Sequence, residues 1–118
     1  MPQPPRLSDR QALLRNRRRA ALAAEPAVFL HEEAIIEIEE RLASVNRSFT
    51  RPAIVTGFPE VWADVIPKAL VVPDDDALAL EAQAHDLVVH AMSLHWADDP
   101  VGQLAQARLA LKPDGLLL

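Results

Sequence analysis

Two side chains that could line a binding site stand at the end of the longest run of strand-forming residues. The run DLVVHAMSLHW covers residues 86–96 and closes with His95 and Trp96. In open parallel sheets, ligands bind beyond the carboxyl ends of the strands, so an imidazole and an indole placed there would face a ligand. The alternative is a Trp96 that fills the space between sheet and helix, with His95 as a surface residue.

The other reactive residue types lack the neighbours that catalysis needs. Ser93 has no G-x-S-x-G turn around it, which argues against a serine hydrolase. The chain contains no cysteine, which excludes a cysteine nucleophile and a thiolate zinc site. No pair of histidines has metal-ligand spacing with a supporting carboxylate. His31 falls on the apolar stripe of a predicted helix, where a hydrogen-bonded core or interface histidine is more common than a ligand.

Charge is distributed unevenly along the chain. Residues 1–24 carry six arginines and one aspartate, whereas residues 51–118 carry four basic and ten acidic residues. The net charge of −5 and the acidic body argue against a nucleic-acid-binding protein, because phosphate recognition needs a basic face. The arginines at 15 and 17–19 either bind phosphate, lipid heads or an acidic partner, or form a solvated helix face.

Composition and pattern predict one folding unit of the α/β class. Half of the 118 residues are apolar, enough for a core, and no stretch is long and apolar enough to span a membrane. Strand candidates alternate with helix candidates, which indicates a parallel sheet. The strand candidates are 53–57, 68–72, 86–96 and 116–118, the helix candidates are 59–66 and 101–112, and a turn is predicted at 112–115.

Two helices are predicted before the first strand. The first begins at a capping box formed by Ser8 and Gln11. The second, within 27–45, is amphipathic and needs a core to lie on. The helical and strand periodicities predict a set of buried side chains: Leu14, Ile35, Ile38, Leu42, Ile54, Val88, Val89 and Leu104.

Three segments occur in a combination that is specific to one family. They are DLVVHAMSLHWADDP (86–100), QARLALKPDGLLL (106–118) and the loop PDDDALAL (73–80), while LSDRQALLRNR stands where a motif like FDR-xLxR occurs. In these segments the chain resembles the class I S-adenosylmethionine-dependent methyltransferases. It is most similar to the branch that contains the malonyl-carrier methyltransferase of biotin synthesis and the complex I assembly-factor methyltransferase.

The resemblance implies a fold and a cofactor site. The fold is α/β, with a helical extension over residues 1–50 and a truncated Rossmann-like core, a short parallel sheet with flanking helices, over 51–118. The resemblance implies four cofactor-binding residues: Gly57, Asp74, Asp75 and His95. It implies one substrate-facing residue, Trp96. For the acidic loop the alternative is a solvated, strand-ending turn.

The chain departs from this family at the glycine motif. Gly57 matches the first glycine, but Val55, Pro59 and Val61 replace the acid and the next two glycines. Those glycines let the backbone approach the cofactor, and proline also removes an N–H there. The interval before Asp74 is about one crossover unit too short for the family's ribose-binding acid.

These features lead to two main hypotheses. The resemblance implies an S-adenosylmethionine-dependent methyltransferase, or an N-terminal fragment of one, that transfers a methyl group by direct displacement to an unknown small-molecule or protein acceptor. The degraded glycine motif favours a catalytically silent binding or assembly module with little or no affinity for S-adenosylmethionine. We further expect a cytoplasmic protein. We also expect a homodimer, because the chain stops at an unfinished strand and leaves apolar surface uncovered.

Overall fold

The computed structural model describes residues 9–22, 29–45, 47–75, 77–92, 94 and 97–118. Among these residues, no helix is long and apolar enough to cross a membrane. The elements in chain order are α1 (Arg10–Leu22), α2 (Phe29–Val45), β1 (Pro52–Thr56), α3 (Pro59–Trp62), β2 (Leu70–Val72), β3 (His85–Ala91), α4 (Pro100–Ala110) and β4 (Leu111–Leu117).

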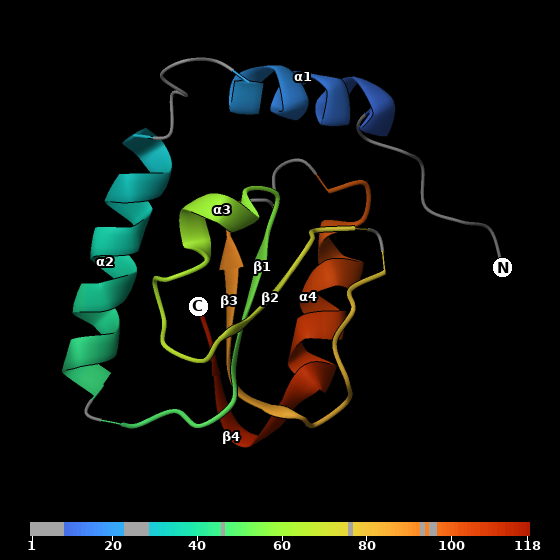
Figure 1. The fold of residues 1–118 in the computed structure, drawn as a ribbon. Coiled ribbons are helices and arrows are strands. Elements are labelled where there is room, and N and C mark those ends of the chain that lie inside the picture. Colours follow the sequence, from blue (N-terminus) through green and yellow to red (C-terminus); the bar gives the residue numbers. More distant parts are fainter. Residues whose placement is uncertain (1–8, 23–28, 46, 76, 93, 95–96) are drawn as a thin grey trace, which may run out of the picture.

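The strands form one parallel sheet in the order β2-β1-β3-β4 (Figure 1). Ile54 of β1 lies opposite Val71 of β2 on one side and Val89 of β3 on the other. The chain leaves β1 toward β2 and then returns to the opposite side of β1 to form β3. The strand order therefore reverses between β1 and β3, and ligands bind at the carboxyl end of such a switch point. The predicted parallel α/β architecture is confirmed.

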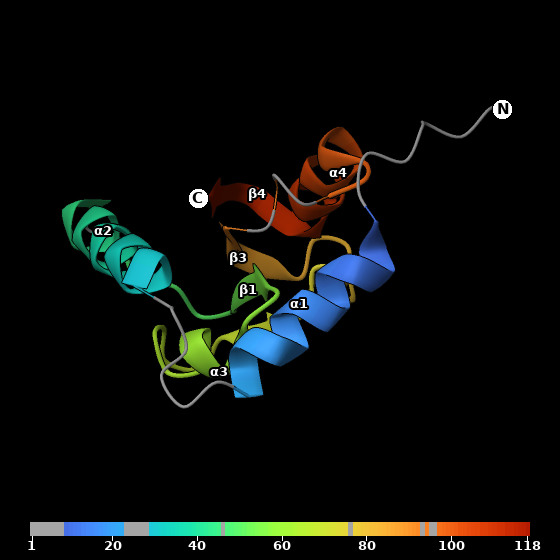
Figure 2. The same cartoon turned by 90° about the horizontal axis from the view of Figure 1, so that it is seen from above.

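Helices cover both faces of this sheet (Figure 2). Successive strand residues point to opposite faces, so Val55 and Val88 meet Ala107 of α4 in one apolar cluster. Ile54 and Val89 belong to a second cluster, which α2 and α3 cover. Two small cores thus share one sheet and hold it as a middle layer.

Most of the side chains predicted to be buried lie in these clusters. Ile54, Val88 and Val89 are buried completely or nearly so, because their strands have neighbours on both sides and helices on both faces. The residues of α2 are half-buried and pack against the second cluster; they are Ile35, Ile38 and Leu42.

Two of the burial predictions are wrong. Leu14 is 46% exposed and Leu104 is 38% exposed. On α1 the buried leucine is the preceding one, Leu13. On α4 the side chains that face the sheet include Ala107 and Ala110. Small alanines let the helix approach the strands closely, which leaves the larger leucines of α4 turned outward.

The helix starts follow the expected chemistry with one change of residue. Asp99 directly precedes Pro100 and caps α4, since its Oδ1 accepts a hydrogen bond from Gly102 N in the first turn. At α1 the cap is Asp9, whose Oδ1 accepts a hydrogen bond from Ala12 N at 3.1 Å. Ser8 of the predicted capping box lies outside the described residues. Aspartate accepts N-cap hydrogen bonds as well as serine does.

The predicted turn at 112–115 does not interrupt the last strand but is contained in it. His85 of β3 pairs with Leu111 of β4, but Leu87, two residues further along β3, pairs with Leu116. The pairing is therefore irregular at the turn sequence, where β4 has extra residues. The apolar residues on both sides of the insertion pair with the same neighbouring strand. The strand predicted at 116–118 is therefore the second half of a longer element.

Candidate functional site

Gly57 and Asp74 lie at the carboxyl edge of the sheet, where they follow β1 and β2. Asp74 is only 2% exposed, and Gly57 is half-buried. Thr56 ends β1 with its Oγ1 accepting a hydrogen bond from Phe58 N at 3.0 Å. This contact turns the chain directly into α3 at Pro59. The segment that aligns with a glycine loop is thus a tight strand-to-helix turn.

Helix α1 lies across this edge of the sheet (Figure 1). Its Arg17 contacts residues at this edge. Nη1 and Nη2 of Arg17 donate to the two carboxylate oxygens of Asp74, each at 2.8 Å. The guanidinium carbon lies 5.7 Å from the centre of the Phe58 ring. A side chain added at Gly57 would collide with the same guanidinium. One arginine therefore covers both residues that the sequence singles out.

Arg10, two turns before Arg17 on the same face of α1, binds the same loop. Its Nη2 lies 3.2 Å from Asp74 Oδ1 and 3.1 Å from Asp75 Oδ1. The side chain of Asp75 is 60% exposed, so it forms the outer rim of the group. We call Arg10, Arg17, Asp74 and Asp75 the Arg–Asp cluster. It brings two predicted site residues, Asp74 and Asp75, together with two arginines, and Gly57 lies against one of these arginines.

The Arg–Asp cluster keeps Asp74 ionised. Burial alone would raise the pKa of this carboxyl group, because it penalises the charged form. The hydrogen bonds and charge of Arg17, followed by those of Arg10, outweigh the burial and hold the pKa of Asp74 below its ordinary value. A bidentate guanidinium–carboxylate pair is a strong, oriented interaction. Asp74 is therefore a buried anion whose acceptor positions are in use.

A second group of contacts, made by α4, fixes the backbone of the acidic loop at Asp74 and Asp75. Gln103 of α4 is 2% exposed, and its Nε2 lies 3.3 Å from the carbonyl oxygens of both Asp74 and Asp75. Its Oε1 lies 2.7 Å from His90 Nε2 of β3. Because an amide oxygen only accepts, His90 donates from Nε2. Its Nδ1 is buried without a hydrogen-bond partner among the described residues.

Aromatic side chains support the turn after β1. Trp62 of α3 is buried, and its Nε1 donates to Nδ1 of His31 on α2 at 3.0 Å. The His31 ring lies 4.6 Å from the ring of Phe58, which also faces Arg17. His31 is a hydrogen-bonded histidine at a helix–core contact, as the apolar stripe predicted. It ties α2 to the candidate site.

The remaining predicted site residues cannot be placed. His95 and Trp96 lie outside the described residues, as does Ser93. The strand predicted to run to Trp96 ends at Ala91, since the next residue, Met92, has a positive φ of 53° that leaves the extended conformation. The expected roles of His95 and Trp96 stay predictions.

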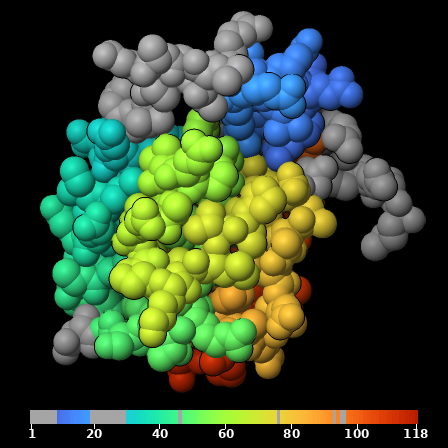
Figure 3. Space-filling model, in the orientation of Figure 1, coloured from blue at the N-terminus to red at the C-terminus, as the bar shows by residue number. Residues whose placement is uncertain are grey.

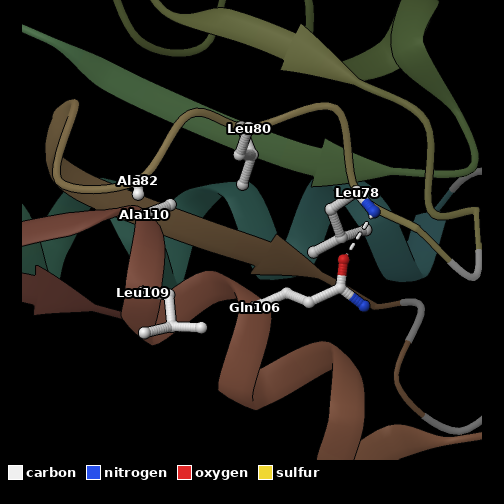
Figure 4. Close-up of a pocket in the computed structure, with 6 residues that line it drawn as sticks. All are labelled: Leu78, Leu80, Ala82, Gln106, Leu109 and Ala110. Atoms are coloured by element: carbon white, nitrogen blue, oxygen red, sulfur yellow. Dashed lines mark hydrogen bonds between the residues drawn. The ribbon is translucent and has the colours of Figure 1, made fainter.

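A hollow of about 190 Å³ opens elsewhere, between the loop that precedes β3 and the second half of α4 (Figure 4). Gln106 Oε1 accepts a hydrogen bond from Leu78 N there at 2.7 Å. The lining has no acidic or basic side chain and does not include any residue of the Arg–Asp cluster; it consists of Leu78, Leu80, Ala82, Gln106, Leu109 and Ala110. Among the described residues, no three His, Asp or Glu side chains gather as metal ligands.

Arg10, Arg17 and Gln103 are absent from the sequence-based list of site residues. A signal exists for the arginines, because their spacing of seven places both on the helix face that carries the buried Leu13. Gln103 stands four residues before Ala107, which is buried on the same face of α4. A polar side chain at an inward position indicates a buried hydrogen-bonding role.

The match to a known family agrees with this geometry. A family profile described as "Methyltransferase domain" covers residues 27–118, which include the whole sheet and exclude α1. The chain belongs to this methyltransferase family. The parallel sheet with its flanking helices is accordingly a partial Rossmann-like methyltransferase core. The family expected from the sequence, the class I S-adenosylmethionine-dependent methyltransferases, is confirmed.

Curated relatives match a shorter stretch. The chain is similar to a zebrafish protein (Danio rerio) named "Arginine-hydroxylase NDUFAF5, mitochondrial", at 38% identity over 53 residues, 45% of this chain and 16% of that protein. The human protein (Homo sapiens) of the same name is 40% identical over 53 residues, 45% of this chain and 15% of that protein. The match thus spans about a sixth of the relatives' length. No solved structure matches this chain.

The family uses S-adenosylmethionine, and in the described arrangement α1 occupies the residues that the resemblance assigns to this cofactor. Asp74, which the resemblance implies to be cofactor-binding, is already bound by two arginines. The backbone that would approach the cofactor, at Gly57, lies against the Arg17 guanidinium. The residue types at the edge agree with a remnant of the family site, but α1 fills the space above them.

Proposed function

We propose that this chain is an S-adenosylmethionine-dependent methyltransferase, or an N-terminal part of one, with its cofactor site at the carboxyl ends of β1 and β2. The observation that carries the proposal is the meeting of Gly57 and Asp74 on one guanidinium at the switch-point edge of a methyltransferase sheet. S-adenosylmethionine, when bound, supplies the methyl group. Asp74 and Asp75 would hold the cofactor at this edge, and the family resemblance assigns His95 to the cofactor and Trp96 to the acceptor.

Cofactor binding by this chain is weak in the proposal. Only Gly57 of the glycine motif is present, and the ribose-binding acid is missing. A hydrogen bond to a charged group contributes about 1.5–3 kcal/mol, so its loss weakens binding roughly ten- to a hundredfold. We expect a dissociation constant above about 100 μM for S-adenosylmethionine.

Isothermal titration with S-adenosylmethionine and S-adenosylhomocysteine tests this expectation. We expect weak binding heat in the wild type and none in Asp74→Ala. The control is Asp64→Ala, which changes an exposed surface residue and should keep the heat of the wild type. This pattern would support a cofactor site at Asp74. Micromolar binding by the wild type would contradict the expectation of weak binding and would indicate a fully formed cofactor site. Binding that is equal in both variants would place the cofactor elsewhere.

A second candidate is a catalytically silent binding or assembly module. It is favoured by the filled state of the site, in which Arg17 uses both carboxylate oxygens of Asp74. A family fold does not by itself establish methyl transfer, and the relatives are named for another reaction, as "Arginine-hydroxylase". No heat from either cofactor, in the wild type and in a variant without Arg17, would favour this candidate.

The acceptor and the cellular setting belong to the proposal as well. A small molecule or a protein serves as the methyl acceptor, and nucleic acid does not, because the body of the chain is acidic. We propose a cytoplasmic location, although the names of the relatives include "mitochondrial". Assays for methyl transfer with labelled cofactor and candidate acceptors, combined with cell fractionation, test these two points.

A further inference from the structure

We propose that α1 is a strap that closes the cofactor cleft and must release Asp74 before the cofactor can bind. This inference rests on the proposed cofactor site. It extends that proposal from the residues that form the site to the element that controls access to it. The strap consists of α1, Arg10–Leu22, and its anchor is the Arg–Asp cluster.

The position of α1 is the first observation. The helix lies across the end of the molecule toward which β3 points, over the carboxyl edge of the sheet (Figures 1 and 2). In the space-filling view its blue atoms form part of the surface at this end of the molecule (Figure 3). The family match begins at residue 27, so α1 lies outside the matched methyltransferase domain.

The nature of the attachment is the second observation. Among the described side chains of α1, the only fully buried apolar one is Leu13, while Leu14 is 46% exposed. The other attachments are ionic: Arg17 holds both oxygens of Asp74, and Arg10 holds Asp74 and Asp75. Salt screens the outer contact between Arg10 and the exposed Asp75 more strongly than the buried Arg17–Asp74 pair, so α1 is held by charge pairs of unequal sensitivity to ionic strength. Such a helix can be released without unfolding the sheet.

The third observation is that the closed arrangement is incomplete. Nε of Arg17 is buried and has no hydrogen-bond acceptor among the described residues. A buried donor without a partner carries a free-energy penalty. The closed state is therefore less favourable than its two short hydrogen bonds suggest, and a ligand that donates to Asp74 competes with Arg17 for the same carboxylate.

Amide hydrogen exchange measures the strap without any cofactor. The variants are Arg17→Gln and, as a matched control on the same helix, Arg18→Gln, whose side chain is exposed. We expect exchange in α1 to rise about tenfold or more in Arg17→Gln, because a hydrogen-bonded charge pair is lost. Exchange in β1 and β3 should stay unchanged, and Arg18→Gln should behave as the wild type. Unchanged exchange of α1 in Arg17→Gln would overturn the strap.

Faster exchange in β1 and β3 of Arg17→Gln would show that this variant disturbs the whole fold. In that case a salt series on the wild type tests the strap instead. Raising sodium chloride from about 0.05 to about 0.5 M shortens the range of charge interactions severalfold. Selective acceleration of exchange in α1 supports the strap. Uniform or absent acceleration contradicts it.

Titration of the same variants with S-adenosylmethionine separates the strap from the proposed function. The strap predicts that Arg17→Gln binds the cofactor about tenfold more tightly than Arg18→Gln and the wild type. Equal binding by all three would overturn the competition, whatever the exchange data show. A loosened α1 without cofactor binding in any variant would uphold the release of α1 on loss of Arg17 and overturn the proposed cofactor site.

Discussion

At the scale of single residues, Gln103 holds the acidic loop in place. Its side chain bridges two backbone carbonyls of that loop and the imidazole of His90. We expect Gln103→Met, which keeps the length but removes the amide, to lower the free energy of unfolding by about 2 kcal/mol or more. The cause is that buried polar groups lose their partners. Urea unfolding followed by circular dichroism measures this loss.

The exposed Gln11 of α1 provides the control for this change. Gln11→Met should alter the free energy of unfolding by no more than about 0.5 kcal/mol, as is usual for surface substitutions. Equal unfolding midpoints for Gln103→Met and Gln11→Met would show that the bridge adds nothing to stability.

The same residues show which part of the candidate site is predictable from sequence. Gly57 and Asp74 stand next to strand ends, so local pattern and family motif both point to them. Their neighbours Arg17 and Gln103 come from helices distant in sequence, and only the packing of those helices decides what they contact. A periodic pattern identifies the inward face of a helix but not the partner beneath it.

At the scale of elements, α2 offers an internal comparison of its two faces. Ile38 is half-buried and packs against the cluster that contains Ile54, whereas Ile36 is 57% exposed. We expect Ile38→Ala to cost about 1–2 kcal/mol of unfolding free energy, less than the roughly 2–5 kcal/mol of a fully buried isoleucine. Ile36→Ala should stay within about 0.5 kcal/mol. Chemical denaturation of both variants tests the orientation of the helix, and a larger loss for Ile36→Ala would contradict it.

The attachment of α1 should depend on pH through Asp74. The pKa of Asp74 lies below the ordinary value of 3.8, with Arg17 and Arg10 as the charged groups that face it and Asp75 beside it. Between the folded pKa and 3.8 the unfolded chain binds a proton that the folded chain does not bind. Stability therefore rises with pH across this window, is complete above it, and is lost as the pH falls through the folded pKa.

A comparison of unfolding midpoints at about pH 6 and about pH 3 measures this effect. The wild type should lose more stability on acidification than Asp74→Asn, in which the titrating group is absent. Asp86 also has a pKa below its ordinary value, since the Thr50 and Arg51 backbone amides outweigh its partial burial. Its contribution is the same in both proteins and cancels in the comparison. Parallel pH profiles would contradict an ionised, paired Asp74.

Element prediction succeeded where local chemistry decides and failed where packing does. The short apolar runs became the strands, and Asp99 caps α4 as its position before a proline suggests. The orientation of α4 was wrong at Leu104, because the helix places alanines rather than leucines against the sheet. The turn signal at 112–115 was absorbed into β4, because pairing with β3 continues on both sides of it.

At the scale of the whole molecule, the alternation of strands and helices was sufficient to predict a parallel sheet. Alternation does not predict how much of the sheet this chain contains or how its edges are covered. In the described residues, β4 pairs with β3 and forms one edge of the sheet, and α4 lies beside it (Figure 2). This end of the molecule combines an open strand edge with an exposed helix surface.

That surface leads to the last prediction, which is self-association. Val101 is 76% exposed and Leu109 68% exposed, so α4 presents large apolar side chains on its surface. Open edges and contiguous apolar surface favour pairing, and two copies that meet through the same face form a closed two-fold dimer. We expect a dimer in light scattering, converted to monomer by Leu109→Lys. Leu30→Lys, which places the same charge on an exposed leucine of α2, should stay dimeric. A wild type that scatters as a monomer at high concentration, or a dimer insensitive to Leu109→Lys, would show that this face is not the contact.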